Sequence, residues 1–386
     1  MLADCVASVR PATLSAPAMP VAACPQRVLS LDALRGLTMV WIVGGRELLV
    51  AAVQFFYPEC PWIDGLKAQL DHPWEGYVAW DFIMPMFLFV VGAALPWAMA
   101  KRMRSGGPLR PTYGRIFRRV LLLWVIGIVF QQIRYLPGTF EIFSNCLQAI
   151  AVGYLVTSLA LLHLPVKGQV GLFVGLVAAY GAILMFVPFP GHAAGTLRAD
   201  ANLALWVDQI VLGPFRRAHG FTWVLSSLGF AATVLLGALA GQLLRSRLTN
   251  VRKLLWMVAI GLSCAATGWV WSYWLPLNRH VWTSSMILWA GGLSFLVLAL
   301  FYAVLDVGGL RWWSFPFIVV GANALLIYVL DSFVDKLSIA AVNWTNVFLE
   351  AEWPVQQVDL CSALVEVGVL WAICWVLYRR RIFLRA

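Results

Sequence analysis

Charged residues are scarce in this sequence. Asp, Glu, Lys and Arg make up 12% of the 386 residues, whereas 61% are hydrophobic. A soluble domain has about 25% charged residues and is about half apolar, so this balance excludes an ordinary soluble protein. The apolar runs are long and do not alternate with polar residues, which favours membrane-spanning helices over strands. The composition therefore predicts an all-α fold, a polytopic helical membrane protein.

Familiar cofactor, metal and nucleic-acid motifs are also missing. The seven cysteines are scattered without a CxxC pair or metal-ligand spacing, so we infer neither a disulfide framework nor a metal site. We find no P-loop, dinucleotide fingerprint, zinc-protease helix, serine-nucleophile elbow or internal repeat. The net charge of +10 has no nucleic-acid signature beside it and is better explained by basic loops on the inner side of a membrane.

Ten apolar windows are long enough to cross a bilayer. We expect residues 28–386 to form a single transmembrane domain. Residues 1–27 are expected to form a flexible tail, because prolines interrupt their apolar stretch. The gap 189–220 is expected to be an ordered external loop, and the gap 334–357 another. The ten predicted spans are 30–56, 79–100, 116–135, 141–163, 168–188, 221–244, 252–274, 282–304, 312–333 and 358–378.

The distribution of Lys and Arg predicts the orientation of these spans. With the N-terminus inside, the inner segments carry nineteen Lys and Arg residues. Basic residues favour the cytoplasmic side, so both termini are predicted to be cytoplasmic. His72 then lies on the outer side. The membrane is predicted to be a bacterial inner membrane. The outer segments carry only seven: Lys67, Arg134, Arg198, Arg216, Arg217, Arg279 and Lys336.

Polar residues inside the spans are the exceptions to the apolar pattern. In the first span Asp32, Arg35 and Arg46 share one helical stripe, which predicts a polar face running from the cytoplasmic end towards the outside. Gln148 and Asn323 are polar residues of later spans. Each of them alone is typical of a hydrogen bond between helices. Together they favour a polar cavity within the bundle, because ionisable groups seldom face lipid.

The segment 70–81 places an imidazole among carboxylates just before a long apolar run. His72 is flanked by Asp71, Glu75 and Asp81. Histidine can accept a proton or attack as a nucleophile near neutral pH, and a carboxylate can orient its ring. The alternative is an interfacial loop whose tryptophans belong to the aromatic belt and whose charges are hydrated. Asp81 favours a functional site, because it lies where the span is already entering the membrane and needs a partner there.

Several motifs, in order from about residue 28 to 386, resemble the transmembrane acyltransferases related to heparan-α-glucosaminide N-acetyltransferase. The most specific is 72–92, in which Trp74, Gly76, Asp81 and Pro85 stand at the start of the second span. The terminal arginines are the least specific. The matching segments are 30–39 (SLDALRGLTM), 72–92 (HPWEGYVAWDFIMPMFLFVVG), 146–150 (CLQAI), 207–213 (VDQIVLG), 282–285 (WTSS), 321–325 (GANAL) and 378–383 (YRRRIF).

The resemblance implies a helical bundle that takes acetyl-CoA, a co-substrate, from the cytoplasm and acetylates a terminal glucosamine on the opposite face through a histidine. In this sequence His72 would be the general base or a transient acetyl carrier, oriented by Asp71 or Asp81. Hydrogen bonds to the developing oxyanion would come from Gln148, Ser284 or Asn323. The candidate residues for binding CoA itself are Arg35, Arg118 and Arg119. For Arg118 and Arg119 the alternative is equally supported: they would be ordinary basic residues of an inner loop.

Two departures from the family pattern are visible. The family usually has two residues between the histidine and the tryptophan, whereas only Pro73 separates His72 from Trp74. A strict alignment therefore puts Asp71 at the histidine position. An asparagine that we associate with the end of the first span is replaced around 43–45, and we expect a form without the large N-terminal luminal portion of the lysosomal enzyme. These departures leave the acceptor and the acetyl-histidine step open.

A transporter or permease for a sugar or cell-wall fragment is the second hypothesis, because polar and broken helices also occur in that class. An inverted repeat would favour transport, and we find none. The partners we expect are an amino sugar or glycan acceptor and membrane lipid, with no nucleic acid, and the sequence leaves open whether the chain forms a homodimer.

Overall fold

The computed structural model describes residues 28–57, 62–74, 76–104, 109–134, 140–216, 220–348 and 353–383, so the predicted tail 1–27 and Glu75 lie outside the described residues. Within these ranges the chain is helical and has no strand, only two isolated β-bridges in the segment 189–202. Nine helices of this described part are long and apolar enough to cross a membrane, or ten if one bent pair counts as a single span. The prediction of an all-α polytopic protein with about ten spans is confirmed.

The helices follow the predicted spans closely, with short helices between them. They are α1 (Leu29–Val40), α2 (Arg46–Phe56), α3 (Ile63–Gln69), α4 (Ile83–Arg104), α5 (Arg110–Arg134), α6 (Cys146–His163), α7 (Val166–Phe186), α8 (Leu203–Leu212), α9 (Ser227–Arg245), α10 (Asn250–Trp271), α11 (Ser284–Phe301), α12 (Phe315–Ala322), α13 (Ala324–Phe348) and α14 (Val355–Arg379). Single turns lie between or beside them: η1 (Trp41–Gly45), η2 (Ala79–Phe82), η3 (Gly213–Phe215), η4 (Tyr302–Val307) and η5 (Trp312–Ser314).

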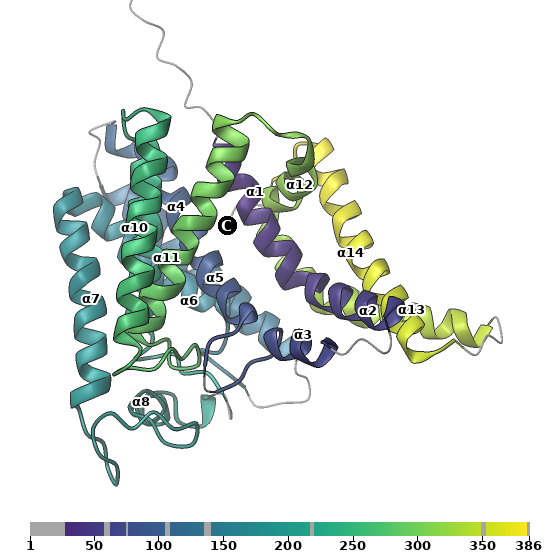
Figure 1. Cartoon of the computed structure of the whole chain (residues 1–386), viewed down its shortest axis with the longest axis horizontal. Helices are drawn as coiled ribbons and strands as arrows, with labels where there is room; N and C mark the ends of the chain where they lie inside the picture. Colours follow the sequence, from purple (N-terminus) through teal and green to yellow (C-terminus); the bar gives the residue numbers. More distant parts are fainter. Residues whose placement is uncertain are drawn as a thin grey trace, which may run out of the picture.

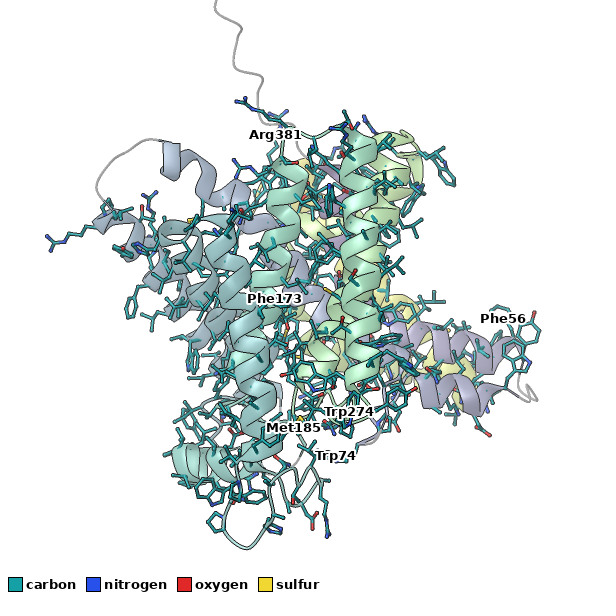
Figure 2. The ribbon with its side chains drawn as sticks, turned by 60° about the vertical axis from the view of Figure 1, so that its left-hand side comes forward. Phe56, Trp74, Phe173, Met185, Trp274 and Arg381 are labelled. Carbon is teal, nitrogen blue, oxygen red and sulfur yellow. The ribbon has the colours of Figure 1, made fainter. Side chains whose placement is uncertain are left out.

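The long helices run between two ends of a bundle. In Figure 1, α7, α10 and α11 stand on one side and α1, α12 and α14 on the other, while α3 and α8 lie at one end. The closest pairings are α10 with α11, α4 with α9, and α1 with α12. One hydrophobic core runs through the bundle. Figure 2 places Trp74 and Arg381 at opposite ends, so the segment beside His72 and the C-terminal arginines are separated along the helices.

Glycines allow the central helices α4 and α9 to touch through their backbones. A Cβ added at Gly92 would collide with the Val234 carbonyl, and one at Gly237 with the Phe89 carbonyl. Helices in a membrane gain no hydrophobic driving force from one another, so such close van der Waals contact is a main source of their association. This crossing holds α4, which begins just after Asp81, against the centre of the bundle.

The first predicted span is broken in its middle. Val43 has φ −111° and ψ 80°, and Gly44 has φ +81°, so the chain leaves the helical region between α1 and α2. Glycine has no Cβ and adopts this positive φ without strain. The prediction of one uninterrupted polar stripe from Asp32 to Arg46 is therefore wrong, because the two halves are separate helices. Hydropathy averaged over a window does not detect such a break.

The ninth predicted span is also interrupted. α12 and α13 meet at Asn323 with a bend of 71°. α13 then continues to Phe348, so the expected loop at 334–357 is helical over much of its length. The expected external loop at 189–220 is described over 189–216, where it contains the short helix α8, while 217–219 lie outside the described residues.

Candidate active site

Asp81 is the buried anchor of the site. It lies in η2, and 1% of its side chain is exposed. Its Oδ2 accepts a hydrogen bond from the Val78 backbone N–H at 3.3 Å, which caps the turn that leads into α4. Its Oδ1 lies 3.4 Å from both His72 Nδ1 and Arg279 Nη1. A carboxylate at the start of a span is costly unless it is paired, and these contacts pair it.

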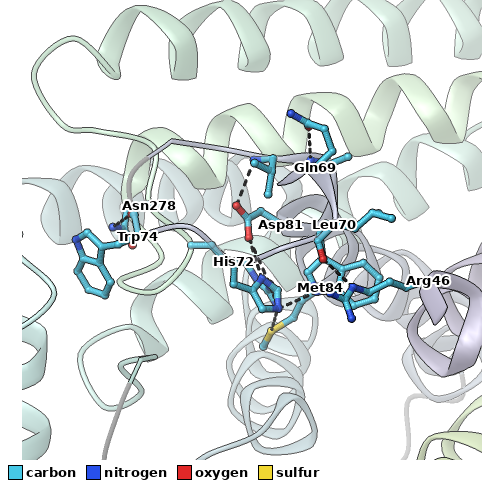
Figure 3. A network of polar contacts seen from close by, with 12 residues as sticks. Arg46, Gln69, Leu70, His72, Trp74, Asp81, Met84 and Asn278 are labelled. Atoms are coloured by element: carbon cyan, nitrogen blue, oxygen red, sulfur yellow. Dashed lines mark hydrogen bonds and ion pairs between the residues drawn. The ribbon is translucent and has the colours of Figure 1, made fainter. Parts of the chain in front are cut away.

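His72 is held by three neighbours, of which Figure 3 labels Asp81. The indole N–H of Trp80 donates to its Nε2 at 2.7 Å, and Nδ1 faces Asp81. Nη1 of Arg279 lies 2.7 Å from Nδ1 and 3.2 Å from Nε2. Trp80 and Arg279 can only donate, so the ring must provide a lone pair. A doubly protonated ring would have none and would place its charge against the guanidinium.

These surroundings keep His72 neutral. Its burial, first of all, lowers its pKa below the ordinary value of 6.5, and the charge of Arg279 acts in the same direction. The hydrogen bond and charge of Asp81 oppose this shift without cancelling it. A neutral imidazole is the form that accepts a proton or attacks a carbonyl carbon. About a third of the side chain is exposed, so the ring can be approached.

Arg279 comes from the turn between α10 and α11, and this turn is firmly tied. The side chain of Asn278 accepts from Val281 N–H at 3.0 Å and donates to the Trp74 carbonyl at 2.8 Å. Trp282 adopts φ +59°, which is uncommon for a residue with a Cβ, and its indole N–H donates to Thr233 at 3.1 Å. The turn is thus locked both to α9 and to the segment beside His72, and this fixes the guanidinium between His72 and Asp81.

Sequence reasoning missed Arg279 as a member of the site. It treated this arginine only as one of the few basic residues of the outer segments. Its partners His72 and Asp81 are 207 and 198 residues away in the chain, so no local spacing reveals the contact. The available signals were the rarity of outer arginines and its position three residues before the WTSS motif.

Several buried polar atoms near this centre have no hydrogen-bond partner among the described residues. They are the Tyr77 hydroxyl, Nε of Arg279 and both ring nitrogens of His280. Burial raises the pKa of Tyr77, so its hydroxyl keeps its proton and can donate. Buried polar groups in native proteins are normally satisfied by protein, water or ligand. This concentration of unsatisfied atoms therefore indicates where a polar molecule would find partners.

The remaining predicted residues divide between the two ends. Asp71 is exposed beside His72 and has no hydrogen bond to it, so Asp81 is the better placed of the two carboxylates to orient the ring. Gln148 is fully buried at the start of α6, where it accepts from Ser144 N–H and donates to the Ile142 carbonyl. Ser284, at the start of α11, donates to the Val177 carbonyl at 2.8 Å.

Asn323 lies at the bend between α12 and α13 and donates to the Ile382 carbonyl at 3.2 Å. Because Ile382 follows Arg381, this places Asn323 near the end opposite Trp74 (Figure 2). The structure therefore does not bring Asn323 together with His72. Asn323, Gln148 and Ser284 each donate to a backbone carbonyl, which favours the interhelical and capping roles over the oxyanion role.

The three candidate arginines for CoA have different surroundings. Arg35 pairs with Asp32 at 3.2 Å one turn away on α1. Arg118 is exposed on α5. Its neighbour Arg119 turns towards α6, where its guanidinium lies 4.6 Å from the ring centroid of Tyr154 and its buried Nε has no partner in the described part of the chain. Of the adjacent pair, only Arg119 faces the interior.

Comparison with known proteins supports the motif-based resemblance. The human heparan-alpha-glucosaminide N-acetyltransferase is 22% identical to this chain over 94% of the chain and 60% of the human protein. The mouse protein of the same name is 21% identical over 80% of the chain and 55% of its own length. The chain is thus distantly similar to the heparan-alpha-glucosaminide N-acetyltransferases. No protein-family model matches the chain.

The chain spans little more than half the length of these N-acetyltransferases. Several segments that resemble them have clear structural roles here. Asp208, in the segment 207–213, accepts from the backbone N–H groups of Trp223 and Val224, both at 2.8 Å, and so ties α8 to the segment before α9. The segment 282–285 forms the turn that holds Arg279. These two segments therefore help to build the framework around His72.

Proposed function

We propose that this protein is an integral membrane acetyltransferase that moves an acetyl group from cytoplasmic acetyl-CoA to an amino sugar on the outer side of a bacterial inner membrane. The observation that carries the proposal is the buried Asp81, which orients a neutral, partly exposed His72 with Arg279 beside it. The distant N-acetyltransferase relatives support the reaction class. The acceptor class and the donor are part of the proposal.

The chemistry needs an unprotonated nitrogen. An ammonium group has no lone pair, so the amine of the acceptor must lose a proton before or while it attacks the acetyl carbon. His72 serves either as the base or as the group that carries the acetyl between the two substrates. Arg279 is placed to stabilise negative charge on the carbonyl oxygen, because a fixed buried cation costs little reorganisation during the reaction.

The deciding experiment uses the whole protein in proteoliposomes. Labelled acetyl-CoA is supplied on one side, and glucosamine and other amino sugars on the other. The proposal expects labelled N-acetylated sugar on the acceptor side. Absence of product with every acceptor and either orientation would contradict it.

A transporter for a sugar is the second candidate, because both the first and the ninth spans are interrupted, as helices around transport sites often are. The same proteoliposomes separate the hypotheses. Accumulation of unmodified sugar without acetyl-CoA would favour transport.

The orientation is a further prediction, because the excess of basic residues in the inner segments favours cytoplasmic termini. In intact cells, a membrane-impermeant thiol reagent should label cysteines engineered near Gly65 and Ala194, but not ones near Gly106. Labelling of the opposite set would place His72 on the cytoplasmic side.

The environment of Arg119 predicts a contribution to the binding of CoA. Thr157 and Ser158, one turn from Tyr154 on α6, also have buried hydroxyls without partners in the described ranges. We expect Arg119→Gln to raise the Kd for acetyl-CoA tenfold, about 1.4 kcal/mol, because a phosphate would lose a forked donor.

The matched control for this prediction is Arg118→Gln, in which the neighbouring exposed arginine is changed in the same way. Its Kd, measured by isothermal titration, should stay close to that of the unmodified protein. Equal changes in Kd for the two variants would mean that neither arginine binds CoA specifically and that both only set the orientation in the membrane.

A further inference from the structure

His280 is the most deeply buried histidine near the proposed centre, and its backbone is fixed. Its carbonyl accepts from the Thr222 N–H at 2.9 Å and the Thr222 hydroxyl at 3.1 Å, which ties it to the segment before α9. Only 8% of the residue is exposed. The turn that positions Arg279 therefore also positions His280.

Aromatic rings surround the imidazole of His280. It is stacked on Phe221, with ring centroids 4.5 Å apart and an angle of 8° between the planes. Trp74 lies 5.0 Å away and His72 6.4 Å away, the latter nearly perpendicular. The ring thus lies beside the tryptophan of the most specific motif and beside the proposed base or acetyl carrier.

Neither nitrogen of His280 forms a hydrogen bond with any described residue, although the Pro73 carbonyl is close enough to favour a proton on one of them. Burying these nitrogens without hydrogen-bond partners costs free energy of folding, and a phenylalanine at this position would avoid that cost. A purely structural residue would gain nothing from it. By contrast, both nitrogens of His72 already face Trp80, Asp81 or Arg279.

The surroundings of His280 keep its ring uncharged. Burial, first, and then the charge of Arg279 lower its pKa to about 4, while Asp81 opposes the shift and His72 adds to it slightly. The ring is therefore neutral at pH 7 and keeps one free lone pair.

We infer that His280 is a second catalytic histidine, which contacts the amine of the acceptor and takes its proton while His72 stays fixed by Asp81 and Trp80. This inference rests on the proposed acetyl transfer. The amine lone pair forms the C–N bond to the acetyl carbon. The bond from that carbon to the leaving group, the CoA sulfur or a nitrogen of acetylated His72, breaks. The proton that the amine loses passes to His280, and His280 returns it to the leaving group, so atoms and charge balance.

The test is His280→Phe, which keeps an aromatic ring against Phe221 but removes the nitrogens. In folded, monodisperse protein we expect acetyl-CoA affinity to be unchanged and the transfer rate to fall about 10²- to 10⁴-fold, the usual contribution of an acid or base. His280→Ala should be at least as slow, and added imidazole should partly restore its rate, which a loss of packing alone would not allow. The control is His192→Phe, because His192 is also stacked on a phenylalanine, at 4.7 Å, but is exposed in the outer loop.

The outcomes separate the two proposals. No transfer by the unmodified protein would overturn the acetyltransferase function and the role of His280 with it. Transfer by the unmodified protein together with an undiminished rate in folded His280→Phe would overturn only the role of His280. A slow His280→Ala that imidazole does not restore would also overturn it.

Discussion

Replacing His72 by alanine is expected to lower the rate of acetyl transfer by about 10² to 10⁴ if the ring is the general base, and by more if it carries the acetyl group. Acetyl-CoA affinity should stay within about threefold, because His72 is proposed to take part in the chemical step and removing a reacting group need not remove ground-state binding. Single-turnover rates and isothermal titration on the same folded protein measure the two quantities.

His192→Ala is the matched control for this experiment, since that ring is exposed in the segment 189–202 and contacts Phe189 rather than the buried centre. His280 is unsuitable as a control because its ring centroid lies only 6.4 Å from that of His72. Full activity in His72→Ala would remove His72 from the mechanism. The single-residue spacing between His72 and Trp74 would then indicate that the catalytic site lies elsewhere in this chain.

Replacing Arg279 by glutamine is expected to destabilise the protein by about 3–5 kcal/mol, because it leaves the Asp81 carboxylate buried without its cation. Both side chains are almost fully buried, 10% and 1% exposed, so solvent screens this pair little. The double variant Asp81→Asn, Arg279→Gln removes both charges and should recover part of the loss. Thermal unfolding in detergent compares the three proteins. Equal stability of the single and double variants would show that the pairing contributes little.

The same substitution should change the pH dependence. In the unmodified protein the pKa values of His72 and His280 lie below 6.5, so the unfolded chain binds more protons as the pH falls below that value. The stability that these two neutral rings contribute is therefore fully present above pH 6.5 and is lost as the pH falls through their folded pKa values. The activity that depends on the neutral rings is lost over the same range. Removing the Arg279 charge raises both pKa values, so the acid limb of the rate profile should move to higher pH. An unshifted limb would mean that the guanidinium does not act on either ring.

Hydropathy predicted where the chain crosses the membrane, because apolar helices of about 20 residues have few alternatives in a bilayer. It missed the breaks at Gly44 and Asn323, where one residue changes the backbone direction without changing the average hydropathy. Similarly, buried polarity indicated that Gln148 and Ser284 need partners, but it could not say that these partners are backbone carbonyls.

The site was only half predictable for a related reason. His72 and Asp81 are nine residues apart, so their cooperation follows from local sequence. Arg279 and His280 join them through the packing of α4, α9 and α11, and that packing depends on glycine contacts such as Gly237 against Phe89. Sequence spacing carries no record of such contacts. The charge of Asp81 alone indicated that a partner was missing.

The pairing of Asp81 with Arg279 also sets an order of events during synthesis. The two residues are 198 positions apart, so at about 5–20 residues per second the carboxylate leaves the ribosome roughly 10 to 40 s before its guanidinium. Throughout that interval α4 begins with an acidic residue that lacks its cation, and a position close to the headgroups would make this tolerable. Nascent chains that end before Arg279 would contain every earlier span and still lack the centre. The final assembly of this bundle therefore depends on the arrival of the turn before α11.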